Sequence, residues 1–171
     1  AGLRLKKATY HAVKDNPSYH PGRCAAVVID GMEVGVMGQV HPLAAKNYGI
    51  DTDVYCAEIS FTKLMQCRLP DATYTPLPKY PAVTRDLALI CDEAVTVAQA
   101  EEVITAAAGK LLRDVKLFDI YRGVGVPEGK KSMAFSLELR ADDRTLTDTD
   151  SEGVVTKVLN SLKEKINATL R

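Results

Sequence analysis

The sequence predicts an α+β protein in two parts, the second of which is a four-stranded antiparallel sheet with two helices on one face. Three observations lead to this fold class. A proline-rich stretch separates two unlike halves of the chain. The second half alternates strand and helix patterns, and each of its two helices opens with a capping box.

The proline-rich stretch is "LPDATYTPLPKYPAV", residues 69–83, with four prolines and almost no periodicity. Such a composition is typical of a stiff, extended connector. We therefore place a linker at residues 71–83. It joins a first part at residues 1–70 to a second part at residues 84–171.

The first part alternates short strands and turns. Residues 24–30 and 33–40 are predicted to be strands around a glycine turn, and residues 54–61 a further strand. Residues 42–49 are predicted to be a short helix, with a proline in the first turn and a glycine at the end. Residues 1–23 have little pattern, so this part resembles the last portion of a larger sheet.

The second part has sharper signals. Thr96 with Gln99, and Thr147 with Asp150, have the spacing of capping boxes at helix starts. Apolar residues repeat four apart along the second helix. The predicted elements are a strand at 85–92, a helix at 96–109, strands at 113–122 and 132–140, a helix from 147 and a short strand at 168–171. This β-α-β-β-α-β order is the ferredoxin-like split βαβ unit, which leaves one face of its sheet uncovered.

The loop between the two central strands holds several glycines and two lysines, which raises the alternative of a phosphate-binding loop. That motif needs two glycines separated by four residues, whereas Gly123 and Gly129 are separated by five. A period-2 apolar run follows the loop, so no helix N-terminus points at an anion. The sequence therefore predicts a hairpin turn.

Matching the apolar residues of the two strands gives the predicted register of this hairpin. Phe118 is expected opposite Phe135. Ile120 is expected opposite Met133, and all four side chains are expected on the face that packs against the helices. Alternation then turns the neighbouring residues outward together onto the uncovered face: Asp119, Tyr121, Ser132 and Ala134.

The composition is that of an ordinary globular protein, 46% hydrophobic and 26% charged over 171 residues. Lysine plus arginine and aspartate plus glutamate both number 22. This balance excludes a protein that coats nucleic acid without regard to sequence, because such binding needs a large positive excess. It does not exclude a local basic patch.

The cysteines and histidines lack the spacings of a metal site. The four cysteines form no CxxC pair, which favours free thiols in a reducing compartment over a zinc site. No apolar run reaches the roughly 18 residues of a membrane span, and no signal peptide opens the chain. We therefore expect a cytoplasmic protein with no metal and no membrane partner.

Several stretches carry a resemblance to a known family. The second part contains "YPAVTRDLALICDE", "LFDIYRG", "EGKKSMAFSLELR" and "RTLTD". These resemble the C-terminal ferredoxin-fold anticodon-binding domain of the bacterial-type phenylalanine–tRNA ligase (phenylalanyl-tRNA synthetase) beta subunit family. In the first part, "YHPGRCAAVVIDG" and "GVMGQVHP" resemble part of the class II synthetase-like core module that precedes this domain.

The resemblance implies a role in protein biosynthesis. Members of the family act in an α2β2 assembly of two alpha and two beta subunits, which attaches phenylalanine to tRNA-Phe with ATP and magnesium. Catalysis belongs to the alpha subunit, so the present chain is expected to recognise the anticodon and to be inactive alone. The residues agree, since they form no nucleophile–base pair and no metal constellation.

Asp119 is the first candidate for contact with tRNA. Phenylalanine codons demand guanine as the first anticodon base, and a carboxylate can accept hydrogen bonds from both N1–H and N2–H₂ of its Watson–Crick edge. Ser132 is expected to add a hydrogen bond and Tyr121 a stacking surface. The alternative is that Asp119 only caps the backbone or pairs with Arg122.

Three basic residues are further candidates, each with a structural alternative. Lys130 and Lys131 in the hairpin are expected either to contact RNA phosphates or to be solvated loop charges. Arg85, at the start of a strand beside the linker, is expected either to contact RNA or to form an ion pair that fixes the linker's exit.

A second function of a different class stays open. A ferredoxin-like module can also bind a small molecule or a protein partner for regulation or assembly. From residue 76 onward the chain has 14 lysines and arginines against 15 aspartates and glutamates. Attraction to tRNA must therefore come from the arrangement of charges and not from their total.

Overall fold

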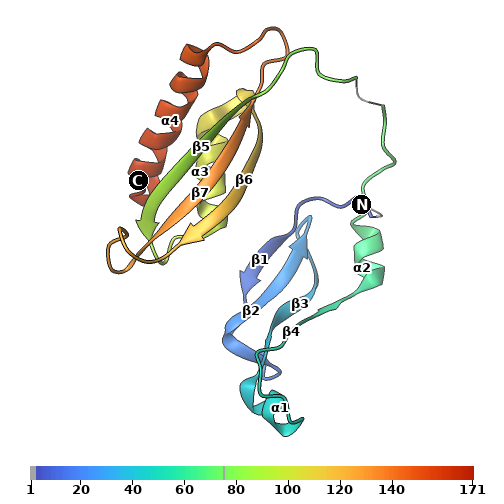
Figure 1. Ribbon diagram of the computed structural model, residues 1–171. Helices are drawn as coiled ribbons and strands as arrows, with labels where there is room; N and C mark the ends of the chain where they lie inside the picture. The colour runs from blue at the N-terminus through green and yellow to red at the C-terminus, as the bar shows by residue number, and fades with distance from the viewer. Residues whose placement is uncertain (1–2, 75) are drawn as a thin grey trace. The chain divides into compact units, whose positions relative to one another are not determined.

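The computed structural model describes residues 3–74 and 76–171 (Figure 1). The chain divides into two compact units, Ala1–Thr75 and Pro76–Arg171. The division falls within the predicted linker. Each unit has its own four-stranded sheet.

The first unit is an antiparallel sheet with the strand order β1-β2-β3-β4 and two short helices. Strands β2 and β3 meet at Asp30 and Gly31, whose φ angles of 52° and 77° suit a tight hairpin turn with a right-handed twist. The elements are β1 (Thr9–Ala12), β2 (Tyr19–Ile29), β3 (Met32–Val40), α1 (Pro42–Asn47), β4 (Tyr55–Ile59) and α2 (Phe61–Gln66).

The second unit confirms the predicted order of elements. All three strand pairs are antiparallel in the order β6-β7-β5-β8, and Figure 1 shows α3 and α4 on the same side of the sheet. The elements are β5 (Val83–Asp92), α3 (Val97–Ala108), the 3-10 turn η1 (Gly109–Leu111), β6 (Leu112–Tyr121), β7 (Lys130–Leu139), α4 (Asp148–Ile166) and β8 (Thr169–Leu170).

Both predicted capping boxes are present. The backbone N–H of Gln99 donates to the Thr96 hydroxyl at 3.2 Å, and the Thr96 N–H donates back to the Gln99 side chain at 2.8 Å. Thr147 and Asp150 exchange the equivalent bonds at 3.2 and 3.0 Å. Each box satisfies two backbone donors that would otherwise lack a partner at a helix start.

The core of the second unit lies between its sheet and its two helices. Alternate residues of β7 are buried, among them Met133, Phe135 and Leu137. They pack with Leu89 of β5 and with a stripe on α4 that includes Val158. The residues between them on β7 therefore face the other side of the sheet, which no helix of this unit covers.

The register of the central hairpin differs from the prediction at one position. Ile120 lies opposite Met133, as predicted, but it is 36% exposed and is not among the residues that pack in the core, so its predicted burial is wrong. Leu117 and not Phe118 lies opposite Phe135. The pairing shifts between Leu117 and Asp119, so Phe118 is the extra residue of a β-bulge. Its predicted place in the core is wrong, because either of two adjacent apolar residues satisfied the pattern.

Candidate nucleic-acid interface

The side of the second sheet opposite the helices carries Asp119, Tyr121 and Ser132 of the predicted site, and we call it the open face. Strand pairing brings residues from three strands into neighbouring rows on this face. One row runs from Asp119 through Ala134 to Ala88. The next runs from Tyr121 through Ser132 to Ile90.

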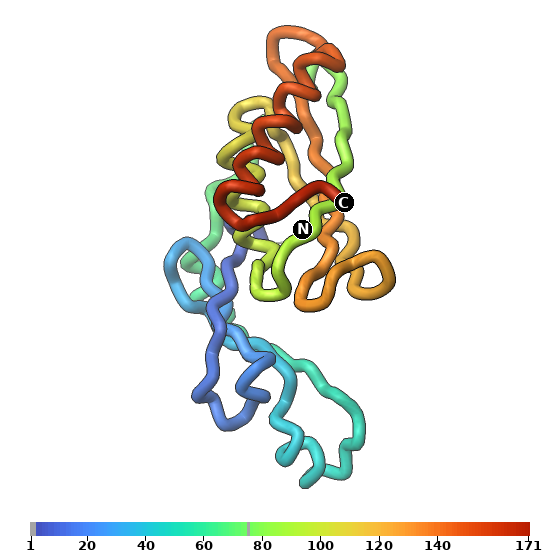
Figure 2. The backbone as a smooth tube through the Cα atoms, turned by 90° about the vertical axis from the view of Figure 1, so that its left-hand side faces the viewer, coloured from blue at the N-terminus to red at the C-terminus, as the bar shows by residue number. Residues whose placement is uncertain are grey.

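The first row forms a shallow floor. Ala134 and Ala88 have only a methyl group each, and adjacent strands lie about 4.8 Å apart. At the β8 end, the backbone N–H of Arg171 donates to the carbonyl of Ala88 at 2.8 Å. Figure 2 shows the C-terminal end of the chain beside β5 in agreement with this bond. The floor therefore lies between Asp119 on β6 and the backbone of Arg171 beside β5, and the Arg171 side chain reaches across the open face to Tyr121 on β6.

The Asp119 carboxylate is exposed, and among the residues described it has no hydrogen-bond or ion-pair partner. Arg122, its predicted alternative partner, is bound to Glu93 instead, with Nη2 to Oε1 at 2.6 Å and Nε to Oε1 at 3.0 Å. This two-point contact lowers the pKa of the Glu93 carboxyl and raises the pKa of Arg122. Asp119 is thus left available to a ligand.

Tyr121 and Ser132 lie on the open face as predicted, but other parts of the chain cover much of both side chains. The Arg171 guanidinium lies 5.3 Å from the centre of the Tyr121 ring, in a cation–π contact. The Tyr121 hydroxyl donates to the carbonyl of Val124 at 3.4 Å. Ser132 is only 4% exposed, although its hydroxyl makes no hydrogen bond within the described part of the chain.

The two hairpin lysines lie on opposite sides of the sheet. Lys131 alternates with Met133 on the helix side, is 7% exposed, and donates from Nζ to the carbonyl of Glu93 at 2.8 Å. Its expected position in a solvated loop is therefore wrong. Lys130 is on the open side and pairs with Asp92 at 3.3 Å.

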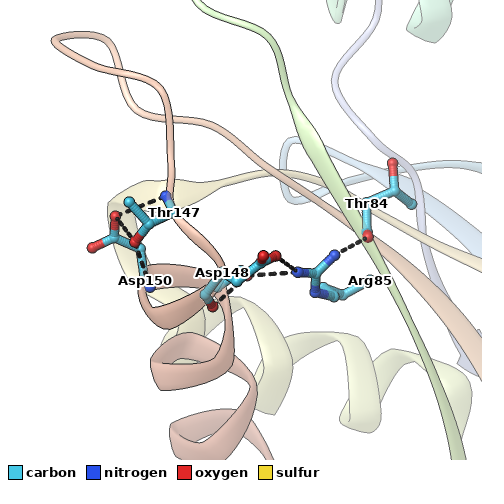
Figure 3. A network of polar contacts seen from close by, with 6 residues as sticks. Thr84, Arg85, Thr147, Asp148 and Asp150 are labelled. Atoms are coloured by element: carbon cyan, nitrogen blue, oxygen red, sulfur yellow. Dashed lines mark hydrogen bonds and ion pairs between the residues drawn. The ribbon is translucent and has the colours of Figure 1, made fainter.

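Arg85 connects the first strand of the second unit to its last helix (Figure 3). One guanidinium nitrogen, Nη2, donates to Asp148 at 2.7 Å and to the Ser151 hydroxyl at 3.0 Å. Nη1 donates to the carbonyl of Thr84 at 3.3 Å. The ion-pair alternative therefore holds, and the partner is the first turn of α4, on the helix side of the sheet.

Two residues of this region were not among the sequence candidates. Phe118 is brought to the open side by the bulge, and Arg171 is brought to Tyr121 by the pairing of β8 with β5. For Phe118 the sequence did carry a signal, the adjacent apolar pair Leu117–Phe118, since only one of two adjacent strand residues can face the core. The contact of Arg171 had no local signal.

Residues 3–74 and 76–171 contain no group of three or more histidine, cysteine, aspartate or glutamate side chains that could hold a metal ion. None of the helices described there is both long enough and apolar enough to span a membrane.

Comparisons with known proteins agree for both units. Residues 78–171 match the model of the ferredoxin-fold anticodon binding domain, and residues 1–61 match that of the phenylalanyl tRNA synthetase beta chain CLM domain. The chain is 40% identical over 169 residues to the phenylalanine–tRNA ligase beta subunit of Clostridium tetani, covering 99% of this chain and 21% of that protein.

Two other beta subunits of the same ligase are similar. The protein of Symbiobacterium thermophilum is 46% identical over 148 residues, covering 86% of this chain and 17% of its own length. That of Bacillus subtilis is 43% identical over 152 residues, covering 89% and 19%. The chain thus spans about a fifth of the length of these relatives. It belongs to the phenylalanine–tRNA ligase beta subunit family and contains that family's ferredoxin-fold anticodon-binding domain.

Proposed function

We propose that this chain recognises the anticodon of tRNA-Phe as part of a cytoplasmic phenylalanine–tRNA ligase. The whole enzyme would attach phenylalanine to tRNA with ATP and magnesium, in an assembly with alpha subunits that supply catalysis. The described residues of this chain offer no carboxylate or histidine cluster for a metal. In this proposal catalysis belongs to the alpha subunits, and the contribution of this chain is binding.

The free carboxylate of Asp119 is the observation that carries the proposal. It lies at the edge of the alanine floor, exposed, with its nearest basic alternative already bound to Glu93. Its two oxygens can accept from N1–H and N2–H₂ of a guanine whose ring rests on the floor. Adenine, cytosine and uracil do not offer two adjacent donors on that edge, so the contact is selective for guanine.

The neighbouring residues have supporting parts. Ser132 lies one row away and can add a hydrogen bond once a base displaces the side chains that cover it. The Arg171 guanidinium contributes positive charge on a face whose other charges are mixed. Lys130 at the end of β7 can contact a phosphate if it leaves Asp92. Arg85 and Lys131, whose cationic groups bond to protein on the helix side, are assigned structural roles.

The test is a titration of the 171-residue chain with a tRNA-Phe anticodon stem-loop. A second stem-loop carries inosine in place of the guanine, which removes only the N2 amino group. We expect Asp119→Ala to reduce the preference for guanine over inosine by about 1–3 kcal/mol, by analogy with two-point base contacts. Asp86→Ala removes the same charge from another exposed position of the open face and should leave the preference unchanged.

Two outcomes would contradict the proposal. A wild-type chain that binds neither stem-loop would remove the RNA-binding function and favour a module for a small molecule or protein. An Asp119→Ala chain with unchanged preference would show that another group recognises the guanine.

A further inference from the structure

The bulge in β6 places two consecutive side chains on the same side of the sheet. Leu117 packs against the core opposite Phe135. Ile120 is outside that core, but it lies directly opposite the buried Met133, and residues opposite each other share a face, so both Leu117 and Ile120 point to the helix side. On a regular strand, two successive residues that face the same side are separated by a single residue. Here Phe118 and Asp119 both lie between them, and both are turned to the open face.

Phe118 is a large apolar side chain in a place where the fold does not need it. It is 55% exposed, and it is absent from the apolar residues that pack against the core of the second unit. Among the described residues its ring has no cation–π partner, whereas one side of the Tyr121 ring is already occupied by Arg171. Phe118 is thus the freely available aromatic surface beside Asp119.

The position of the ring decides which base it can meet. Asp119 closes the floor formed by Ala134 and Ala88, so a guanine held by Asp119 lies inward over β7 and β5. Phe118 is next to Asp119 along the edge strand and is not beneath that floor. It can therefore stack with an adjacent base of a single strand, but not with the guanine itself.

Stacking also fits the charge of this unit. With 14 basic and 15 acidic residues from residue 76 onward, attraction to phosphates is weak. Aromatic stacking contributes affinity that does not depend on net charge, and any base has a suitable face. An RNA-binding unit without a net positive charge therefore needs exposed rings more than a basic unit does.

We propose that Phe118 is a stacking platform for the anticodon base next to the guanine recognised by Asp119, and that the β-bulge is the device that sets the two side by side. This inference rests on the proposed anticodon-binding function. It assigns binding affinity to Phe118 and selectivity for guanine to Asp119. Substitution of each residue should therefore reduce a different one of these two quantities.

The experiment uses the 171-residue chain and an anticodon stem-loop with 2-aminopurine at the middle anticodon base, which is adenine in the GAA anticodon complementary to UUC. Binding to the wild-type chain should quench the probe through stacking. Phe118→Ala should remove the quenching and weaken binding roughly tenfold. The loss should be equal for guanine and inosine stem-loops, so the preference between them stays.

Three further variants distinguish stacking by the ring from other effects of the substitution. Phe118→Tyr keeps an aromatic face and should retain quenching and affinity. Phe118→Leu keeps apolar bulk without a ring and should behave like Phe118→Ala, which also separates stacking from any effect of the alanine on folding. Phe61→Ala removes an aromatic ring that is 67% exposed in the first unit and should bind as the wild type does.

The outcomes separate this inference from the function on which it rests. Wild-type affinity and quenching in Phe118→Ala, with guanine preference lost in Asp119→Ala, would overturn the role of Phe118 alone. Loss of guanine preference in Phe118→Ala with quenching intact would overturn it too, because the ring would then only position Asp119. Absence of binding by the wild-type chain would overturn both proposals.

Discussion

Each unit of the chain has a four-stranded antiparallel sheet of alternating strands, yet the two units differ greatly in how many side chains they bury. In the second unit α3 and α4 close one side of the sheet over fully buried residues such as Leu89 and Phe135. Among the described residues of the first unit, the hydrophobic cluster has three buried members, Val27, Ile29 and Val34. This difference shows that alternation along a strand determines which residues share a face, whereas burial of that face requires a second layer of secondary structure packed against the sheet.

The helices explain the contrast. Each described helix of the first unit has six residues, and α2 has no fully buried residue, although Leu64 is half-buried. The helices of the second unit have 12 and 19 residues and carry buried stripes. A helix of fewer than about 12 residues has little stability of its own and contributes mainly through the apolar face it packs.

The largest expected effect is in the core of the second unit. Phe135 has no exposed surface, so Phe135→Ala should destabilise this unit by about 3–5 kcal/mol. Tyr55→Ala in β4 of the first unit removes an exposed ring and should change stability by less than about 0.5 kcal/mol. Urea unfolding followed by circular dichroism measures both changes. Equal losses of stability in the two variants would show that burial does not distinguish the two units.

An intermediate effect is expected at the helix caps. Thr147→Ala removes the capping box of α4 and should cost about 1 kcal/mol. Ser60→Ala removes the cap of α2, where the Lys63 N–H donates to the serine hydroxyl at 3.4 Å, and should cost less because that helix is short and has no fully buried residue. Thermal unfolding of the two variants is the measurement. A larger loss from Ser60→Ala would mean that α2 stabilises the first unit more than its burial suggests.

The smallest effect is a dependence on pH. Hydrogen bonds from the Thr147 backbone N–H and hydroxyl, and then from Arg144, lower the pKa of Asp150 below its ordinary value of 3.8. The stabilisation is fully present above pH 3.8 and is lost as the pH falls through the lower pKa of the folded state. Asp150→Asn should therefore be less stable than the wild type at neutral pH, and the gap should narrow in acid. A gap that stays constant down to pH 2 would contradict this account.

Much of the second unit could be predicted because its signals are local. The capping boxes at Thr96 and Thr147 and the alternation around Met133 are each contained in a few residues, and all were confirmed. In the first unit, β1 and α2 were missed. β1 is exposed along its length and has only four residues, and α2 has only six residues, none of them fully buried, so each gives too short a pattern to recognise.

The candidate site shows the same limit. Alternation was enough to place Asp119 and Tyr121 on the open face, but Lys131 was assigned to a loop although it is two residues from Met133 and so shares its side. The pairing of Arg122 with Glu93 and the contact of Arg171 with Tyr121 join distant parts of the chain. Only the folded sheet brings such residues together, and the sequence pattern carries no sign of them.

The bulge at Phe118 has a consequence for how this surface can change through insertions and deletions. Loss of one residue from a regular strand turns every following side chain to the opposite face. Loss of Phe118 would instead leave Leu117 and Ile120 on the helix side and restore a regular ladder. A deletion could thus remove an aromatic surface while keeping the core and Asp119 in register, so the bulge makes part of the binding face separable from the fold.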